Sequence, residues 1–202
     1  MGAGLGVLTV RLAVLVSGGG TTLQNFLDRI ADGSLDASIE VVVSSNSTAF
    51  ALERAKAAGI DGHVVRRRDF ETQEAFSDAV TAALEGYDFD LIALAGYTQR
   101  YIFPKQYEGR VLNVHGALLP KFGGQGMWRH HVHEAVLAAG ETESGCTVHI
   151  ADHEYDHGPI LLQKKVPVLP DDTPETLEAR VAEAELEAYP EAIRLMATKL
   201  GL

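Results

Sequence analysis

The sequence has little of several features, and each shortage excludes a class of protein. It holds a single cysteine, Cys146, in 202 residues, so no disulfide can form within the chain, which fits a reducing compartment. No apolar run reaches the roughly 20 residues of a membrane-spanning helix. The apolar first residues lack a preceding basic segment and are interrupted by Arg11, so we interpret them as a leader and a first strand rather than a secretion signal. These absences predict a cytoplasmic protein that does not cross a membrane.

Basic residues are also in short supply. The 17 lysines and arginines face 28 acidic residues, and the formal net charge is −11. Such a surface repels a polyanion at long range, so we expect no nucleic-acid partner. A phosphorylated metabolite stays compatible with this charge, because backbone N–H groups and a helix N-terminus can hold a small anion locally.

The remaining composition is that of an ordinary globular protein. The chain is 46% hydrophobic and 22% charged, which suffices for a sizeable core. We find no low-complexity linker and no internal repeat, and we therefore expect residues 1–202 to form a single domain.

Apolar segments rich in valine, leucine and isoleucine alternate with amphipathic segments along the first half of the chain. This alternation predicts an α/β fold with a Rossmann-like, mostly parallel sheet flanked by helices. We expect strands over 7–16, 38–43, 63–65, 88–95 and 110–115, and helices over 23–30, 49–58 and 72–84.

The second half of the chain follows a different pattern. A helix over 129–139 is followed by strands over 145–151 and 160–168, which predict a C-terminal antiparallel hairpin. A long final helix begins after a Thr173 cap with Pro174 in its first turn, and we expect it to kink at Pro190 and end near Lys199.

A glycine-rich turn follows the first strand. Gly19 and Gly20 precede Thr21 and Thr22, which open the first helix. Glycines allow a ligand to approach the backbone, and the helix adds the positive end of its dipole, so the turn suits a phosphate. The alternative is a βα turn that binds nothing, because the loop has neither a Walker lysine nor the GxGxxG spacing.

The strand over 110–115 ends in two polar side chains. Asn113 and His115 are two residues apart and share one face of the strand. Two hydrogen-bond donors at the carboxyl end of a parallel strand suit a carbonyl that becomes an oxyanion. The alternative is a strand end with two satisfied polar groups. The loop 152–159 at the hairpin tip is dense in carboxylates and imidazoles. If it reaches His115, one of its carboxylates can orient that imidazole and raise its pKa.

Histidines gather on the helix over 129–139. His130, His131 and His133 invite a zinc assignment, but no second histidine completes HExxH and no cysteine joins the spacing. We therefore expect no metal, and expect one of these histidines to point at the active site.

Longer blocks of sequence resemble the phosphoribosylglycinamide formyltransferases, which are folate-dependent enzymes of purine synthesis. The similarity covers nearly the whole chain, and the order and spacing of the blocks carry it. The blocks are VLVSGGGTTLQ (Val14–Gln24), LIALAGY (Leu91–Tyr97), LNVHGALLPKF (Leu112–Phe122), SGCTVHIADHEYDHGPILLQ (Ser144–Gln163) and ARVAEAELEAYPEAI (Ala179–Ile193).

The resemblance implies a function and a set of site residues. The family transfers a formyl group from 10-formyltetrahydrofolate, its co-substrate, to the amine of glycinamide ribonucleotide, without a metal. Its catalytic residues correspond to Asn113, His115 and Asp156, with His149 in support. It also implies contacts with the substrate phosphate (Gly19, Gly20, Thr21 and Thr22), with the amine end of the substrate (Glu185) and with the folate (Thr98, Gln99, Arg100, Tyr101 and Asp152).

The chain departs from the family pattern near the expected site. Gly116 and Ala117 stand where the family usually has proline and serine, and Ala182 stands where a polar or basic residue often assists. The loop over 123–129 is longer than the common form, and the segment between Ala95 and Asn113 is shorter. These changes affect the grip on substrates more than the chemistry.

Other activities share the same catalytic residues. A formyltetrahydrofolate deformylase transfers the formyl group to water, but its relatives have an added N-terminal regulatory domain. Formylation of methionyl-tRNA calls for an extra C-terminal domain and a basic surface. Formylation of an amino sugar, a non-catalytic folate- or nucleotide-binding role and a homodimer stay open.

Overall fold

The computed structural model describes residues 9–128 and 130–202. The expected leader before residue 9, and Arg129 at the start of the predicted fourth helix, lie outside this range. The described strands form one seven-stranded sheet in the order β3-β2-β1-β4-β5-β6-β7. β1 to β5 are parallel, and β6 and β7 are antiparallel to their neighbours. The predicted Rossmann-like sheet with a C-terminal hairpin is confirmed.

The helices and strands follow the predicted order. The strands are β1 (Val10–Val16), β2 (Ala37–Ser44), β3 (Gly62–Val64), β4 (Leu91–Leu94), β5 (Val111–His115), β6 (Glu143–Ile150) and β7 (Ile160–Pro167). The α-helices are α1 (Thr21–Ala31), α2 (Phe50–Ala57), α3 (Gln73–Leu84), α4 (His130–Ala138) and α5 (Pro174–Leu200). Two short 3-10 turns complete the described chain, η1 (Arg67–Asp69) and η2 (Lys105–Tyr107).

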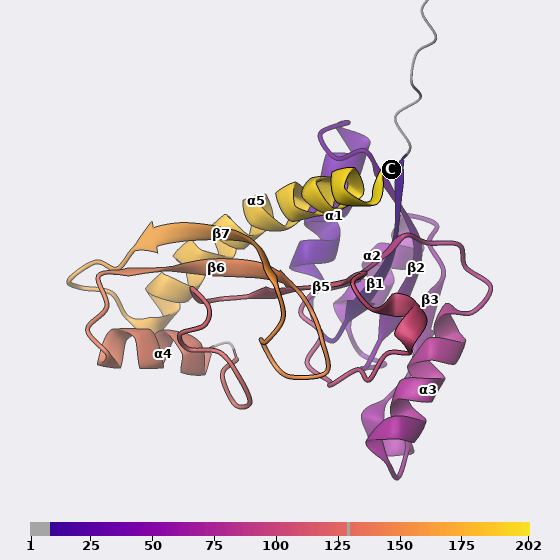
Figure 1. Cartoon of the computed structure of the whole chain (residues 1–202), viewed down its shortest axis with the longest axis horizontal. Coiled ribbons are helices and arrows are strands. Elements are labelled where there is room, and N and C mark those ends of the chain that lie inside the picture. Colours follow the sequence, from indigo (N-terminus) through magenta and orange to yellow (C-terminus); the bar gives the residue numbers. More distant parts are fainter. Residues whose placement is uncertain (1–8, 129) are drawn as a thin grey trace, which may run out of the picture.

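The sheet separates two apolar cores. Buried side chains of α1, α2 and α5 pack on one face, with Leu12, Val14 and Val42 of the sheet among them. α3 covers the other face, where it meets Leu15 and Ile92. Figure 1 shows α5 running along the sheet from the β6–β7 hairpin toward β1. Strands covered on both faces have no polar side to present, which explains their continuous apolar sequences.

β4 begins at Leu91, later than the predicted 88–95, because the two acidic side chains before it form ion pairs with β1. Arg11 of β1 donates to Asp90 through its backbone N–H (2.9 Å) and its Nε (3.1 Å), and it also pairs with Asp88. These contacts lower the pKa of the Asp90 carboxyl. Asp88 and Asp90 thus form an ion-paired entry to the strand, and the Asp90 N–H also donates to the Arg11 carbonyl over 2.8 Å.

The start of α5 follows from its capping sequence. Thr173 accepts a hydrogen bond from the Thr176 N–H, and the Thr176 hydroxyl accepts one from the Thr173 N–H. This reciprocal pair satisfies N–H groups that have no partner inside the helix. Pro174 follows in the first turn, where its missing N–H costs nothing.

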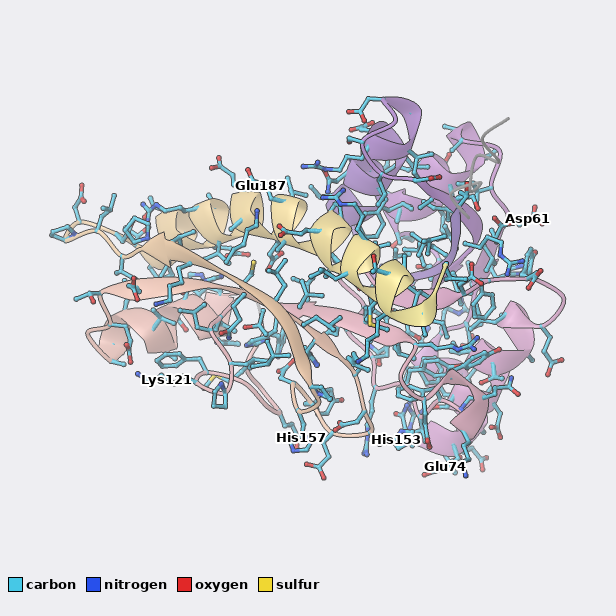
Figure 2. The ribbon with its side chains drawn as sticks, turned by 45° about the horizontal axis from the view of Figure 1, so that its top comes forward. Asp61, Glu74, Lys121, His153, His157 and Glu187 are labelled. Carbon is cyan, nitrogen blue, oxygen red and sulfur yellow. The ribbon has the colours of Figure 1, made fainter. Side chains whose placement is uncertain are left out.

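Pro190 lies within α5, and the helix continues through it to Leu200. Proline has no N–H, so the carbonyl of Leu186 loses its helical partner. Asn25 of α1 donates to that carbonyl through Nδ2 over 2.7 Å. Figure 2 shows the axis of α5 changing direction beyond the labelled Glu187. A hydrogen bond from α1 therefore replaces the helical hydrogen bond that Pro190 cannot make.

Within the described ranges, none of the helices has both the length and the apolarity needed to span a membrane.

Candidate active site

A cavity of about 880 Å³ opens where the direction of strand connection reverses. β2 and β3 continue to one side of β1, and β4 and β5 continue to the other. Ser17 follows β1, Gly96 follows β4 and Gly116 follows β5, and all three line the cavity. Open α/β sheets bind their ligands at this kind of crevice.

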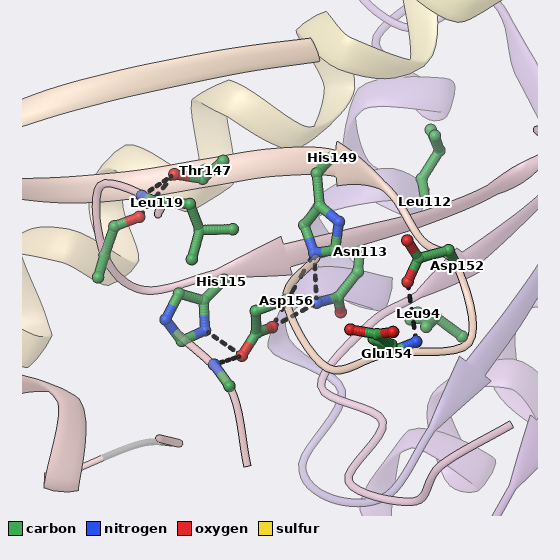
Figure 3. A network of polar contacts seen from close by, with 12 residues as sticks. Leu94, Leu112, Asn113, His115, Leu119, Thr147, His149, Asp152, Glu154 and Asp156 are labelled. Carbon is green, nitrogen blue, oxygen red and sulfur yellow. Dashed lines mark hydrogen bonds and ion pairs between the residues drawn. The ribbon is translucent and has the colours of Figure 1, made fainter. Parts of the chain in front are cut away.

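The pairing of β5 with β6 brings two polar side chains together. Asn113 stands directly opposite His149 in the antiparallel ladder. Asn113 Nδ2 donates to His149 Nε2 over 3.1 Å and lies 3.4 Å from Asp156 Oδ1 (Figure 3). His149 Nδ1 lies 3.4 Å from the Ile150 carbonyl. Burial lowers the pKa of His149, and this pattern of one acceptor and one donor nitrogen fits a neutral ring.

Asp156 reaches the same place from the hairpin tip. Its backbone is left-handed, with φ at 52°, a conformation that aspartate tolerates better than most residues. Gly158 also has a positive φ of 73°, and a Cβ there would lie 2.0 Å from the Ile150 carbonyl oxygen. The tip can therefore fold back onto the end of β6 only with glycine at this position.

His115 lies between two acceptors and is only 6% exposed. Its Nε2 donates to the Phe122 carbonyl over 2.7 Å, and its Nδ1 lies 3.5 Å from Asp156 Oδ2. The other contact of Asp156 Oδ2 is the Gly124 N–H at 3.0 Å. The carbonyl accepts, so Nε2 carries a hydrogen, and any hydrogen on Nδ1 would face the Asp156 carboxylate. Figure 3 shows Asn113, His115, His149 and Asp156 as one connected network.

The glycine-rich turn is built as predicted, but only part of it faces the cavity. Gly20 precedes α1 with φ at 73°, and a Cβ there would lie 2.7 Å from Ala51 Cβ. No side chain caps α1 and no acidic residue lies in its first turn, so its first N–H groups are open to an anion. Thr22 lines the cavity together with Ser17, whereas Gly19, Gly20 and Thr21 do not.

Glu185 of α5 lines the same cavity. Burial raises the pKa of its carboxyl to about 7, and the neighbouring Glu178 adds to the rise. The carboxyl therefore changes charge near neutral pH, which is rare for a glutamate and frequent at functional sites.

The residues expected around the folate lie along one wall of the cavity. The lining includes Thr98, Gln99, Arg100, Tyr101 and Asp152. Arg100 Nη2 donates to the His153 carbonyl over 2.7 Å and so joins the segment after β4 to the hairpin tip. Residues 100–104 form neither helix nor strand, and the 3-10 turn η2 follows them.

Several groups at the site were not predicted from the sequence. The Phe122 carbonyl and the Gly124 N–H are backbone atoms, and a sequence pattern gives no direction for them. Of the histidines on α4, His133 is 3% exposed and lines the cavity, which answers the expectation that one of them points there. His130 and His131 instead lie outside the cavity and pair with Glu134.

In the part of the chain that the structure describes, no three histidine, cysteine or acidic side chains are grouped closely enough to hold a metal ion. Cys146 is buried in β6, and burial raises the pKa of its thiol.

The sequence and the fold both match known proteins. Residues 10–193 match the family described as formyl transferase. The phosphoribosylglycinamide formyltransferase of Haemophilus influenzae is 39% identical over 91% of this chain and 85% of its own length. The trifunctional purine biosynthetic protein adenosine-3 of Drosophila pseudoobscura pseudoobscura is 41% identical, and the chain spans 14% of its length.

Solved structures with similar folds carry the same enzyme names. Glycinamide ribonucleotide transformylase 1 of Symbiobacterium toebii superposes with a TM-score of 0.87 at 39% identity, over 95% of this chain and 89% of that one. The phosphoribosylglycinamide formyltransferase of Brucella melitensis gives 0.83 at 42% identity, over 94% and 96%. These similarities show that the chain belongs to the formyl transferase family, together with these phosphoribosylglycinamide formyltransferases.

Proposed function

We propose that the protein transfers the formyl group of 10-formyltetrahydrofolate to the amine of glycinamide ribonucleotide in purine biosynthesis. The observation that carries this proposal is the Asn113–His115–Asp156 network, which lies in one cavity with the start of α1. The cavity, of about 880 Å³, falls in the size range of small-molecule sites.

The chemistry follows from the donors at the strand end. The acceptor amine attacks the formyl carbon, and negative charge develops on the formyl oxygen. A protonated His115 and the amide N–H groups of Asn113 stabilise that oxygen. Asn113 already donates to His149 at 3.1 Å. The longer 3.4 Å contact with Asp156 is therefore the one that a formyl oxygen replaces.

Proton transfer completes the reaction. The new C–N bond forms first, and the bond from carbon to the folate nitrogen breaks when the oxyanion re-forms the carbonyl. The amine must lose a proton and the departing folate nitrogen must gain one. Asp156 lies 11% exposed beside His115, and we assign it the relay of that proton, through a water molecule where direct contact is lacking.

The two substrates enter from different sides. We assign the open N–H groups at the start of α1, with Gly19, Gly20, Thr21 and Thr22, to the substrate phosphate. Glu185 contacts the amine end of that substrate. The wall from Thr98 to Tyr101, with Asp152, holds the folate.

The test is to incubate the protein with 10-formyltetrahydrofolate, with and without glycinamide ribonucleotide, and to follow loss of the formyl group. Loss only in the presence of the amine is expected. Loss without it identifies a deformylase and contradicts the proposal. A third arm with an amino-sugar nucleotide detects formylation of a different acceptor.

A further inference from the structure

His133 is the buried member of the histidine group on α4. It is 3% exposed and lines the cavity, and the described residues offer its Nδ1 no hydrogen-bond partner. His130 and His131 of the same helix are far more exposed and pair with Glu134. The neighbouring residues therefore leave hydrogen-bonding capacity of this buried ring unused, which is uncommon in proteins.

The surroundings of His133 place it beside the acceptor rather than the folate. A Cβ added at Gly116 would lie 3.3 Å from Glu185 Oε1 and 3.6 Å from His133 Cε1. The strand end that carries His115 is therefore flanked by the carboxyl of Glu185 and the ring of His133.

Few other polar side chains are available on this side of the cavity. Between the end of β5 and α5 the wall contains Gly116, Val181 and Ala182, none of which has a polar side-chain atom. Glu178 and Glu185 supply carboxyl groups there. His133 is a neighbouring side chain whose neutral ring can donate a hydrogen bond, and the Glu185 carboxyl can do so only while it is protonated.

The protonation of His133 follows from its burial. Burial lowers the pKa of the ring against a smaller opposing effect of Glu178, so the ring is neutral near pH 7. Nδ1 is enclosed without a partner, and an enclosed N–H is rarer in proteins than an enclosed lone pair. The single hydrogen therefore belongs on Nε2, which is also the nitrogen left to meet a ligand.

We propose that His133 determines acceptor specificity by donating a hydrogen bond from Nε2 to an oxygen of the acceptor, a hydroxyl or an amide carbonyl, beside Glu185. The proposal rests on the proposed function, because it assigns a residue to the acceptor half of the same cavity. A site built to hydrogen-bond a polar group of its substrate discriminates against molecules that lack it.

The test compares two substitutions at His133. His133→Phe keeps the ring volume and removes the donor, and we expect it to raise KM for glycinamide ribonucleotide about tenfold or more. KM for 10-formyltetrahydrofolate should change little. His133→Gln places an amide N–H near the position of Nε2 and should bring KM for the acceptor back toward the wild-type value.

The matched control is His131→Phe, which makes the same change on an exposed face of α4 and should leave both KM values unchanged. An unchanged KM for the acceptor in His133→Phe overturns the proposal. So does an equal loss for both substrates with a lowered melting temperature that His133→Gln does not restore, because that result marks a packing role.

Calorimetric titration with glycinamide ribonucleotide, without folate, separates this proposal from the proposed function. If the wild type binds the nucleotide but transfers no formyl group, the proposed function is wrong. Weaker binding by His133→Phe then still supports the contact, and equal binding overturns it. A wild type that does not bind the nucleotide overturns both proposals.

Discussion

Asp156 is held in place from several directions, and its charge is central to the proposed chemistry. The Gly124 N–H donates to Oδ2, and the Asn113 amide lies beside Oδ1. We expect Asp156→Asn to keep the shape of the hairpin tip while removing the charge beside His115. Turnover should fall about 10²- to 10⁴-fold, as when a general acid or base is lost, with KM for both substrates changing less.

The control for Asp156 is Glu154→Gln, on the same tip but exposed. Steady-state kinetics on both variants, with far-ultraviolet circular dichroism to confirm folding, gives the comparison. Near-normal turnover in Asp156→Asn would remove the aspartate from the mechanism.

Glu185 makes stability depend on pH. Burial raises the pKa of its carboxyl from 4.5 to about 7, so the folded protein binds this proton more tightly than the unfolded chain. The contribution to stability is complete below pH 4.5 and is lost as the pH rises through about 7. Glu185→Gln removes this loss. We therefore expect its melting temperature to rise relative to wild type, by a few degrees, between pH 5 and 8.

The difference in melting temperature between wild type and Glu185→Gln reports the contribution of Glu185 alone. His133 and His149 have lowered pKa values and so contribute the opposite slope, with stability lost as the pH falls below the ordinary histidine pKa. Scanning calorimetry across this range measures both curves. A constant difference between them contradicts the assignment of a raised pKa to Glu185.

At the scale of elements, one side-chain amide forms a hydrogen bond between α1 and α5. Asn25 Nδ2 donates to the Leu186 carbonyl that Pro190 leaves without its helical partner. Asn25→Ala should cost about 1 kcal/mol in the free energy of unfolding, because the carbonyl stays buried between the two helices. Urea denaturation measures it, with Asp28→Ala on the exposed side of α1 as the control. A loss no larger than that of the control would mean that water replaces the amide.

At the scale of the whole molecule, Tyr189 ties the last helix to the centre of the sheet. Its side chain is completely buried, and its hydroxyl donates to the Leu112 carbonyl over 2.8 Å and lies 3.3 Å from that of Leu94. Tyr189→Phe keeps the edge-on contact with Phe26 and removes the hydrogen bond. We expect a loss of about 1–3 kcal/mol and a fall of roughly 2–4 °C in Tm for each kcal/mol.

We also propose that residues 1–202 unfold as a single domain, because α5 packs along β6 and β7 at one end and reaches α1 at the other. Far- and near-ultraviolet circular dichroism should then report one coincident transition in wild type and in Tyr189→Phe. Tyr155→Phe, at the exposed hairpin tip, should unfold like wild type. Two separated transitions would mean that the hairpin and α5 form a unit of their own.

Sequence pattern alone predicted the order of strands and helices and the mostly parallel sheet. Local rules suffice for these features, because a strand buried on both faces is apolar throughout and a helix repeats its apolar face. The same locality places Asn113 and His115 on one side of β5, since alternate residues of a strand share a face. The glycine-rich turn and the Thr173 cap could be predicted for the same reason, because both depend on neighbouring residues in the sequence.

The tertiary structure decided what the distant residues do. Asp156 was assigned to the site by resemblance, and the register of β6 on β5 with the left-handed turn at the hairpin tip brings it to His115. Neither feature is local to Asp156. The raised pKa of Glu185 and the enclosed ring of His133 depend on how α4 and α5 close over Gly116. Burial is a property of the assembled fold. For that reason the sequence could identify Glu185 and His133 as candidates but could not assign their protonation states.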